Sequence, residues 1–138
     1  MRPNEDSYWH GGEYPFTFDV PESFPYEPPI VTCLTKIWHP NINLDGNVCL
    51  NILRKDWKPV LSINHIIFGL ETLFLSPNPT DPLNKGNFDR TTFFWLNFNS
   101  LDAAVQMVND LDGFITNVRN SLKGTYKFGA HSFPKMIN

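Results

Sequence analysis

Two short stretches near the start of the chain have strand patterns, and in the first of them apolar and polar positions alternate in part. The first covers residues 13–20, with Pro15 near its start, where a missing backbone N–H is tolerated. The second covers residues 30–37 and is rich in Ile, Val and Thr, which favour strands. Four prolines occupy residues 21–29 between them, so we expect two strands joined by a rigid, extended loop.

The clearest helical pattern begins at Ser62, a residue type that favours the N-cap position. It ends at Ser76 and Pro77, because proline cannot continue a helix. A second helix is predicted over residues 102–122, although Gly113 lies within it and lowers its helix propensity. The apolar residues expected on the inner face of the first helix recur at helical spacing: Ile63, Ile66, Ile67, Leu70, Leu73 and Phe74.

Two further segments show no regular period. Residues 38–53 contain the sequence Asp-Gly-Asn at 45–47, which is typical of a tight turn. Residues 86–101 are rich in Phe but follow neither the strand period nor the helix period. A buried strand and an insertion explain residues 86–101 equally well, and a translated intron that keeps the reading frame would produce such an insertion.

The composition indicates one globular domain. The chain has 138 residues, of which 41% are hydrophobic and 18% charged. A net charge of -3 gives no electrostatic reason to expect a nucleic-acid partner, and we find no apolar stretch long enough to predict a membrane span. With two cysteines in the chain, we expect reduced thiols rather than a disulfide framework, which fits the cytoplasm and nucleus.

The histidines and cysteines do not predict a metal site. Zinc ligands usually occur in closely spaced pairs along the chain. That spacing is missing among His10, His39, His65, His131, Cys33 and Cys49.

A short constellation in the irregular region carries the strongest functional information. His39-Pro40-Asn41 is followed, after seven residues, by Cys49. Trp57 and Pro59 come next, in an order that resembles the catalytic region of the ubiquitin-conjugating enzymes. The resemblance runs from about residue 8 to residue 85 and resumes near residue 102. The sequence of residues 48–61 most resembles that of the family members that conjugate the Nedd/Rub modifier.

The resemblance implies an α+β fold of the ubiquitin-conjugating type. An antiparallel meander of about three strands would pack against the helix that starts at Ser62 and a C-terminal helical region. We expect a single domain over residues 1–138, with an insertion at 86–101. The family's usual N-terminal helix and first strand are not found ahead of this pattern, so a truncated domain is expected.

The resemblance also assigns chemical roles. Cys49 would carry a ubiquitin-like protein as a thioester, since a thiolate is both a good nucleophile and a good leaving group. Asn41 would stabilise the oxyanion or order the loop, a simple turn hydrogen bond being its structural alternative. Asp81 would orient the attacking lysine, unless it merely caps a turn. His39 and Pro40 would shape the loop. Neither a His nor a Lys lies next to Cys49 in the sequence, so strong activation of the thiol is not indicated.

Binding surfaces follow from the same resemblance. Tyr26, Pro59 and Val60 match the two loops that bind RING-type ligases, with packing inside the proline-rich loop as the alternative for Tyr26. Phe68 and Thr72 fall on the outer face of the first helix, where the carried modifier would rest.

The expected partners are a Nedd/Rub-type modifier, an activating enzyme, a RING-type ligase and a cullin-like substrate. The protein itself is expected to be monomeric. It would bind no cofactor, because ATP is consumed by the activating enzyme. The alternative function is a catalytically impaired homologue that only binds a ligase.

Overall fold

The computed structural model describes residues 1–80 and 99–138. Strands β1 (Phe16–Asp19) and β2 (Ile30–Cys33) form an antiparallel pair in which Phe16 lies opposite Cys33. Both strands are shorter than the predicted ranges. After Cys33, the Leu34 N–H still donates to the Pro15 carbonyl at 2.9 Å. Pro15 has no N–H to return the bond, so the ladder ends there.

In the described residues, the predicted meander of about three strands is reduced to β1, β2 and isolated bridges. Asn47 forms an isolated antiparallel bridge with Thr32 of β2. The predicted turn before it is present, with Gly46 at a φ of +88°. A Cβ at Gly46 would lie against the Cys33 carbonyl oxygen, so this turn requires glycine. A second hairpin, β3 (Lys127–Phe128) with β4 (His131–Ser132), was not predicted.

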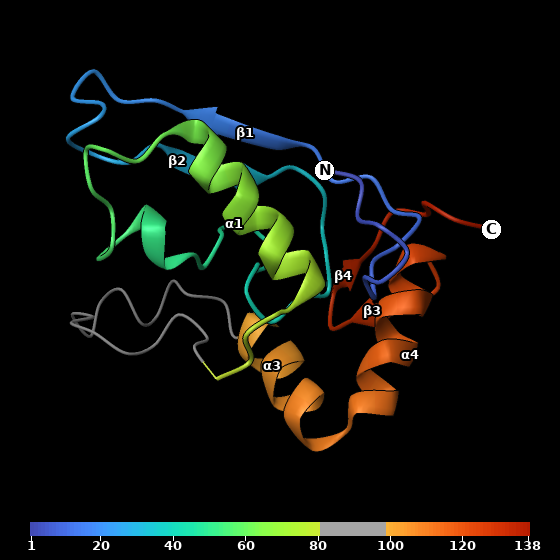
Figure 1. The fold of residues 1–138 in the computed structure, drawn as a ribbon. Helices are drawn as coiled ribbons and strands as arrows, with labels where there is room; N and C mark the ends of the chain where they lie inside the picture. Colours follow the sequence, from blue (N-terminus) through green and yellow to red (C-terminus); the bar gives the residue numbers. More distant parts are fainter. Residues whose placement is uncertain (81–98) are drawn as a thin grey trace.

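Helix α1 (Ile63–Leu75) lies across the β1–β2 pair (Figure 1) and confirms the strongest helical prediction. Ser62 is its N-cap residue, and the Ser62 backbone N–H donates to Nδ1 of His65 at 3.1 Å. The buried residues of α1 are Ile66, Leu70, Leu73 and Phe74. The placement of Ile67 on the inner face is wrong. Its side chain is 39% exposed and lines an open groove beside β1, because the apolar stripe is wider than the surface it covers.

The single helix predicted over residues 102–122 is wrong, because two helices occupy this region. Helix α3 (Asn99–Asn109) and helix α4 (Leu111–Leu122) pack together and are separated by Asp110. The Asp110 side chain accepts a hydrogen bond from the Gly113 N–H at 3.0 Å and caps α4. A Cβ at Gly113 would collide with that carboxylate. The glycine that weakened the predicted helix is therefore part of a helix start.

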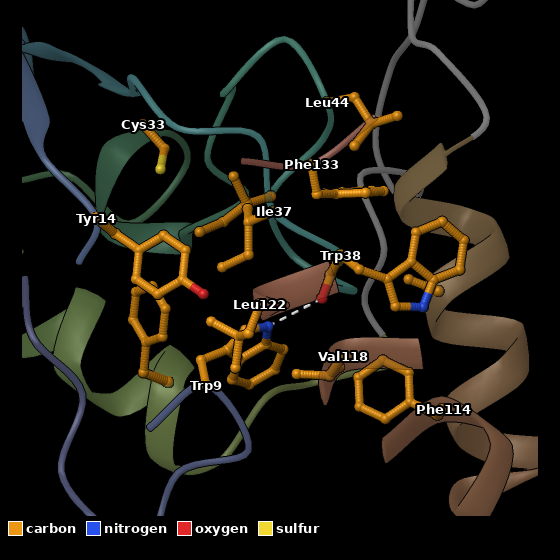
Figure 2. Close-up of a cluster of buried hydrophobic side chains, with 13 residues drawn as sticks. Trp9, Tyr14, Cys33, Ile37, Trp38, Leu44, Phe114, Val118, Leu122 and Phe133 are labelled. Atoms are coloured by element: carbon orange, nitrogen blue, oxygen red, sulfur yellow. Dashed lines mark hydrogen bonds between the residues drawn. The ribbon is translucent and has the colours of Figure 1, made fainter. Parts of the chain in front are cut away.

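Aromatic side chains form much of the buried hydrophobic core (Figure 2). Trp9 is fully buried, and its indole N–H donates to the Trp38 carbonyl at 3.0 Å. Phe74, at the C-terminal end of α1, belongs to the same cluster as Phe114 and Val118 of α4. This cluster fixes the end of α1 that faces the candidate site. None of the described helices is long and apolar enough to cross a membrane.

Candidate active site

Cys49 lies in the irregular loop between the sheet and the 3-10 helix η1 (Asn51–Leu53). Ile42 forms a bridge with Val48, and the Cys49 N–H donates to the Asn41 carbonyl at 2.8 Å. These backbone contacts bring the two ends of the sequence constellation together. The Cys49 residue is 5% exposed. It lines a cavity of about 160 Å³ with Asn41, Leu50, Asn51, Ile52, Leu73 and Asn78.

The Asn41 side chain joins this loop to the segment that follows α1. Its Oδ1 accepts from the Asn78 backbone N–H at 2.9 Å, and its Nδ2 donates to the Asn78 carbonyl at 2.8 Å. Asn41 is 1% exposed, so these bonds replace water contacts that the buried amide has lost. The described residues engage one of the two N–H groups on Nδ2, which leaves a second donor beside the cavity. The two bonds to Asn78 give Asn41 a loop-ordering contact.

His39 lies beneath the same loop and is 1% exposed. The Asn41 backbone N–H donates to its Nδ1 at 2.9 Å, so the ring proton sits on Nε2, 3.1 Å from the Leu73 carbonyl oxygen. The ring stacks on Trp9, with 4.2 Å between ring centroids. Burial lowers the pKa of His39 from 6.5 to about 3. His39 is therefore neutral at physiological pH and bridges two backbone segments. Pro40, next to it, is also buried.

Arg54 is a site residue that the sequence analysis missed. It follows η1, and its Nη2 donates to Sγ of Cys49 at 2.7 Å. A cation beside a thiol favours the thiolate, so the inference of an unactivated thiol overlooked this residue. That inference considered only sequence neighbours of Cys49. The sequence does place an arginine five positions after Cys49. A single helical turn between the two residues brings their side chains together.

The remaining predictions concern Asp81, the insertion, a metal site and Cys33. Asp81 lies outside the described residues, as do residues 86–98 of the predicted insertion. Among the described residues, no group of three or more His, Cys, Asp or Glu side chains could hold a metal ion. Cys33 is the last residue of β2 and is buried, and burial raises the pKa of its thiol.

The residues predicted to bind a ligase lie on two loops that are joined by Trp57. The Trp57 indole N–H donates to the Pro25 carbonyl at 2.8 Å, and its ring contacts Phe24. Tyr26, beside Pro25, is 78% exposed, which argues against packing inside the proline-rich loop. Val60 is 81% exposed, and Pro59 is exposed beside it. The two loops thus present apolar side chains outward from a fixed base.

The outer face of α1 carries Phe68 and Thr72 as predicted from the helical pattern. Phe68 is 71% exposed, and Thr72 is also exposed. The Thr72 hydroxyl donates to the Phe68 carbonyl within the helix at 2.9 Å. Phe68 is thus a large apolar side chain without cover on a helix whose opposite face is core.

Comparison with known proteins gives a consistent result. A family model described as "Ubiquitin-conjugating enzyme" matches residues 1–92. The chain is 50% identical over 124 residues to the NEDD8-conjugating enzyme UBC12 of Yarrowia lipolytica, covering 90% of this chain and 60% of that protein. It is 46% identical over 132 residues to the NEDD8-conjugating enzyme Ubc12 of Dictyostelium discoideum, covering 96% and 50%. The chain therefore spans little more than half the length of these relatives.

The fold also matches a solved structure. The structure of S. cerevisiae Ubc12 is similar with a TM-score of 0.80 and 41% sequence identity, covering all of this chain and 65% of that one. At this identity the likeness extends beyond backbone shape to many side chains. The predicted α+β fold of this type is confirmed.

Proposed function

The chain belongs to the ubiquitin-conjugating enzyme family, and from that premise we propose that it accepts a NEDD8-type modifier as a thioester on Cys49 and passes it to a substrate lysine. The observation that carries the proposal is the position of Cys49. It lines a cavity with Asn41 and Asn78, and a cationic side chain contacts its sulfur. The modifier class rests on the relatives named NEDD8-conjugating enzymes.

The chemistry is an acyl exchange in two halves. In the first, the Cys49 thiolate attacks the carbonyl carbon of the modifier's thioester on an activating enzyme, and the donor sulfur leaves. In the second, a lysine amine attacks the new thioester, and the Cys49 sulfur leaves. Both halves pass through a tetrahedral oxyanion, toward which the second N–H of the Asn41 amide could donate. Asp81 would orient the amine.

His39 has a supporting part in this proposal. A ring with a pKa of about 3 is not in the acidic imidazolium form at neutral pH and is too weak a base to take up a proton there. Its two nitrogens instead bind the backbone at Asn41 and Leu73. These contacts would hold Asn41 and the cavity wall in place during both halves of the reaction.

The partners follow from the surfaces. Tyr26, Pro59 and Val60 would bind a RING-type ligase, because they are exposed on two loops that share Trp57 as a base. Phe68 and Thr72 would contact the carried modifier. A cullin-like substrate, a monomeric state and residence in the cytoplasm and nucleus belong to the same proposal. It requires no bound cofactor, because ATP is used by the activating enzyme.

One assay tests the proposal directly. The protein is incubated with a NEDD8 activating enzyme, ATP and either NEDD8 or ubiquitin, and adducts are resolved with and without reducing agent. We expect a reducible adduct with NEDD8 that disappears in Cys49→Ala and persists in the matched control Cys33→Ala. An adduct that survives Cys49→Ala would refute the assignment.

The same assay separates the alternative function. A folded protein that forms no adduct with either modifier, yet binds a RING-type ligase through Val60, would act as a ligase-binding module. Ligase binding by the uncharged protein, compared with that of Val60→Ala, provides this measurement.

A further inference from the structure

Arg54 brings a charged group into contact with the reacting sulfur of Cys49. Nη2 of Arg54 donates to Sγ at 2.7 Å. The described residues that line the cavity besides Cys49 are Asn41, Leu50, Asn51, Ile52, Leu73 and Asn78, all uncharged. His39, behind the loop, is neutral at physiological pH. Arg54 therefore places a positive charge at the sulfur.

The local backbone explains how an exposed arginine reaches a buried sulfur. Cys49 precedes the single turn of η1, and Arg54 follows it as the C-cap residue. The Arg54 N–H donates to the Asn51 carbonyl at 3.0 Å, which closes the turn. The guanidinium reaches back to the Cys49 sulfur, and Arg54 stays accessible to solvent.

Arg54 is not taken up by an acidic partner in the described part of the chain. The ion pair found there joins Arg2 to Glu13 at the surface. An arginine that made an ordinary surface ion pair would be held by a carboxylate. Arg54 directs its guanidinium to the sulfur instead, and it keeps its charge at any physiological pH.

We infer that Arg54 stabilises the Cys49 thiolate in both halves of the acyl exchange, an inference that rests on the proposed function. During charging, the sulfur lone pair forms the new C–S bond as the C–S bond to the donor cysteine breaks. During transfer, the amine nitrogen forms the C–N bond, the C–S bond to Cys49 breaks, and the sulfur leaves as a thiolate. The amine loses its extra proton to solvent. Arg54 faces the negative sulfur at the start of the first half and at the end of the second.

The test measures the thiol without any partner protein. Iodoacetamide is attacked by the thiolate, the C–S bond forms, and iodide leaves. Its rate with Cys49 is followed against pH by peptide mass spectrometry, which resolves Cys49 from the buried Cys33. The variants are Arg54→Met, Arg54→Gln and Arg54→Lys. Lys55→Met is the matched control, because it removes the same charge one position further on.

The expected result is a change in the pH profile. Without the guanidinium, the midpoint of the profile should move about one pH unit higher. This is the lower end of the shift that an adjacent opposite charge causes, because solvent screens the charge of the exposed Arg54. At pH 7 the thiolate fraction falls about tenfold. The less acidic thiol is intrinsically more nucleophilic, so the net rate falls only about threefold. Arg54→Lys should stay near the wild-type midpoint, and Lys55→Met should match it.

Arg54→Gln separates charge from hydrogen bonding, because it keeps an N–H donor but carries no charge. If Arg54→Met and Arg54→Gln keep the wild-type midpoint, the inference is overturned. A shift in Lys55→Met as large as in Arg54→Met also overturns it, since the effect would then come from general surface charge. The unfolding midpoint of each variant checks that the fold is intact, and the exposed position of Arg54 predicts no change.

Charging assays then separate this inference from the proposed function. A wild-type protein that is never charged, but shows the shifted alkylation profile in Arg54→Met, would refute the proposed function and leave the thiolate contact standing. Normal charging in Arg54→Met at subsaturating activating enzyme would refute the role of Arg54 and leave the proposed function standing. The supporting result is slower charging in Arg54→Met that Arg54→Lys restores.

Discussion

The loop around Cys49 and the two loops joined by Trp57 (residues 24–26 and 57–60) are both irregular backbone, but they differ in how deeply they are buried. Around Cys49, the Asn41 amide and the His39 ring reach backbone groups more than 30 positions away, at Asn78 and Leu73. The loops joined by Trp57 have a hydrogen bond of similar reach, from the Trp57 indole N–H to the Pro25 carbonyl, but Tyr26 and Val60 are exposed to solvent. On the proposed function, the first region performs chemistry and needs fixed positions, whereas the second is a docking surface and needs exposed apolar groups. Substitutions around Cys49 should therefore lower the free energy of unfolding, whereas substitutions of exposed residues in the loops joined by Trp57 should leave it unchanged.

The largest effect is expected at Trp9, which supports the His39 ring. Trp9→Ala would remove a fully buried side chain and the ring stack at 4.2 Å. Deleting a buried Trp lowers the free energy of unfolding by ~3–5 kcal/mol, a large share of the ~5–15 kcal/mol of a typical domain. Urea unfolding measures it, with the exposed Tyr26→Ala as control. Equal losses in the two variants would contradict the contrast between the regions.

Acidic pH should weaken the Cys49 region through His39. In the unfolded chain this ring takes up a proton near its ordinary pKa of 6.5, but in the folded protein only near about 3. Between these values the unfolded state binds more protons, so the free energy of unfolding falls as the pH drops. The loss by pH 4 should be on the order of 3 kcal/mol.

Urea unfolding at pH 7, 6, 5 and 4 measures this slope. Other groups titrate in the same range, so the informative quantity is the difference from His39→Gln, which cannot be protonated. His39→Gln should be less stable at pH 7 and lose less stability on acidification. Parallel slopes for the two proteins would show that His39 does not carry the pH dependence.

The sequence predicted local structure best where one element contains its own signals. Helix α1 has an apolar period, an N-cap at Ser62 and a proline beyond its end, and it forms as expected. The helix over 102–122 was predicted from period alone. That pattern continues across Asp110, where the backbone leaves the helix and the side chain caps the next one. A cap and an interior aspartate look alike until the backbone is known.

The sequence named residues that the structure brings together in the candidate site, but not the contacts between them. The resemblance supplied Cys49, Asn41 and His39. It did not supply the pairing of Asn41 with Asn78, which lies 37 positions away, nor the contact from Arg54, which depends on the turn at η1. Contacts of this kind depend on how separate segments meet in space, and a period or a motif does not encode that.

Asn41→Ala should have a smaller effect on stability than the Trp9 and His39 changes. It removes both hydrogen bonds to Asn78, but Asn78 is exposed and its backbone groups can bind water instead. We expect a loss of ~1–2 kcal/mol in urea unfolding. Asn78→Ala is the matched control, because the bonds to Asn41 use the backbone of residue 78 and should survive.

The same variant tests the second role of Asn41. If its free N–H stabilises the oxyanion, Asn41→Ala should slow the attack of free lysine on the thioester by ~10²–10³-fold, measured as loss of the preformed adduct. Asn78→Ala should react at nearly the wild-type rate. A normal rate in Asn41→Ala would leave it the loop-ordering role alone.

The smallest effect on stability is expected at Val60, which tests the other side of the comparison. Val60 is 81% exposed, so Val60→Ala should change the free energy of unfolding by less than ~0.5 kcal/mol.

On the proposed function, the same change removes an apolar contact with the ligase and should weaken binding about tenfold, which corresponds to ~1.4 kcal/mol. Val20→Ala, at a position 49% exposed elsewhere on the surface, is the control for both measurements. Charging of Cys49 by the activating enzyme should be unchanged in Val60→Ala. Reduced stability in Val60→Ala would mean that the loops joined by Trp57 are as tightly coupled to the fold as the loop around Cys49.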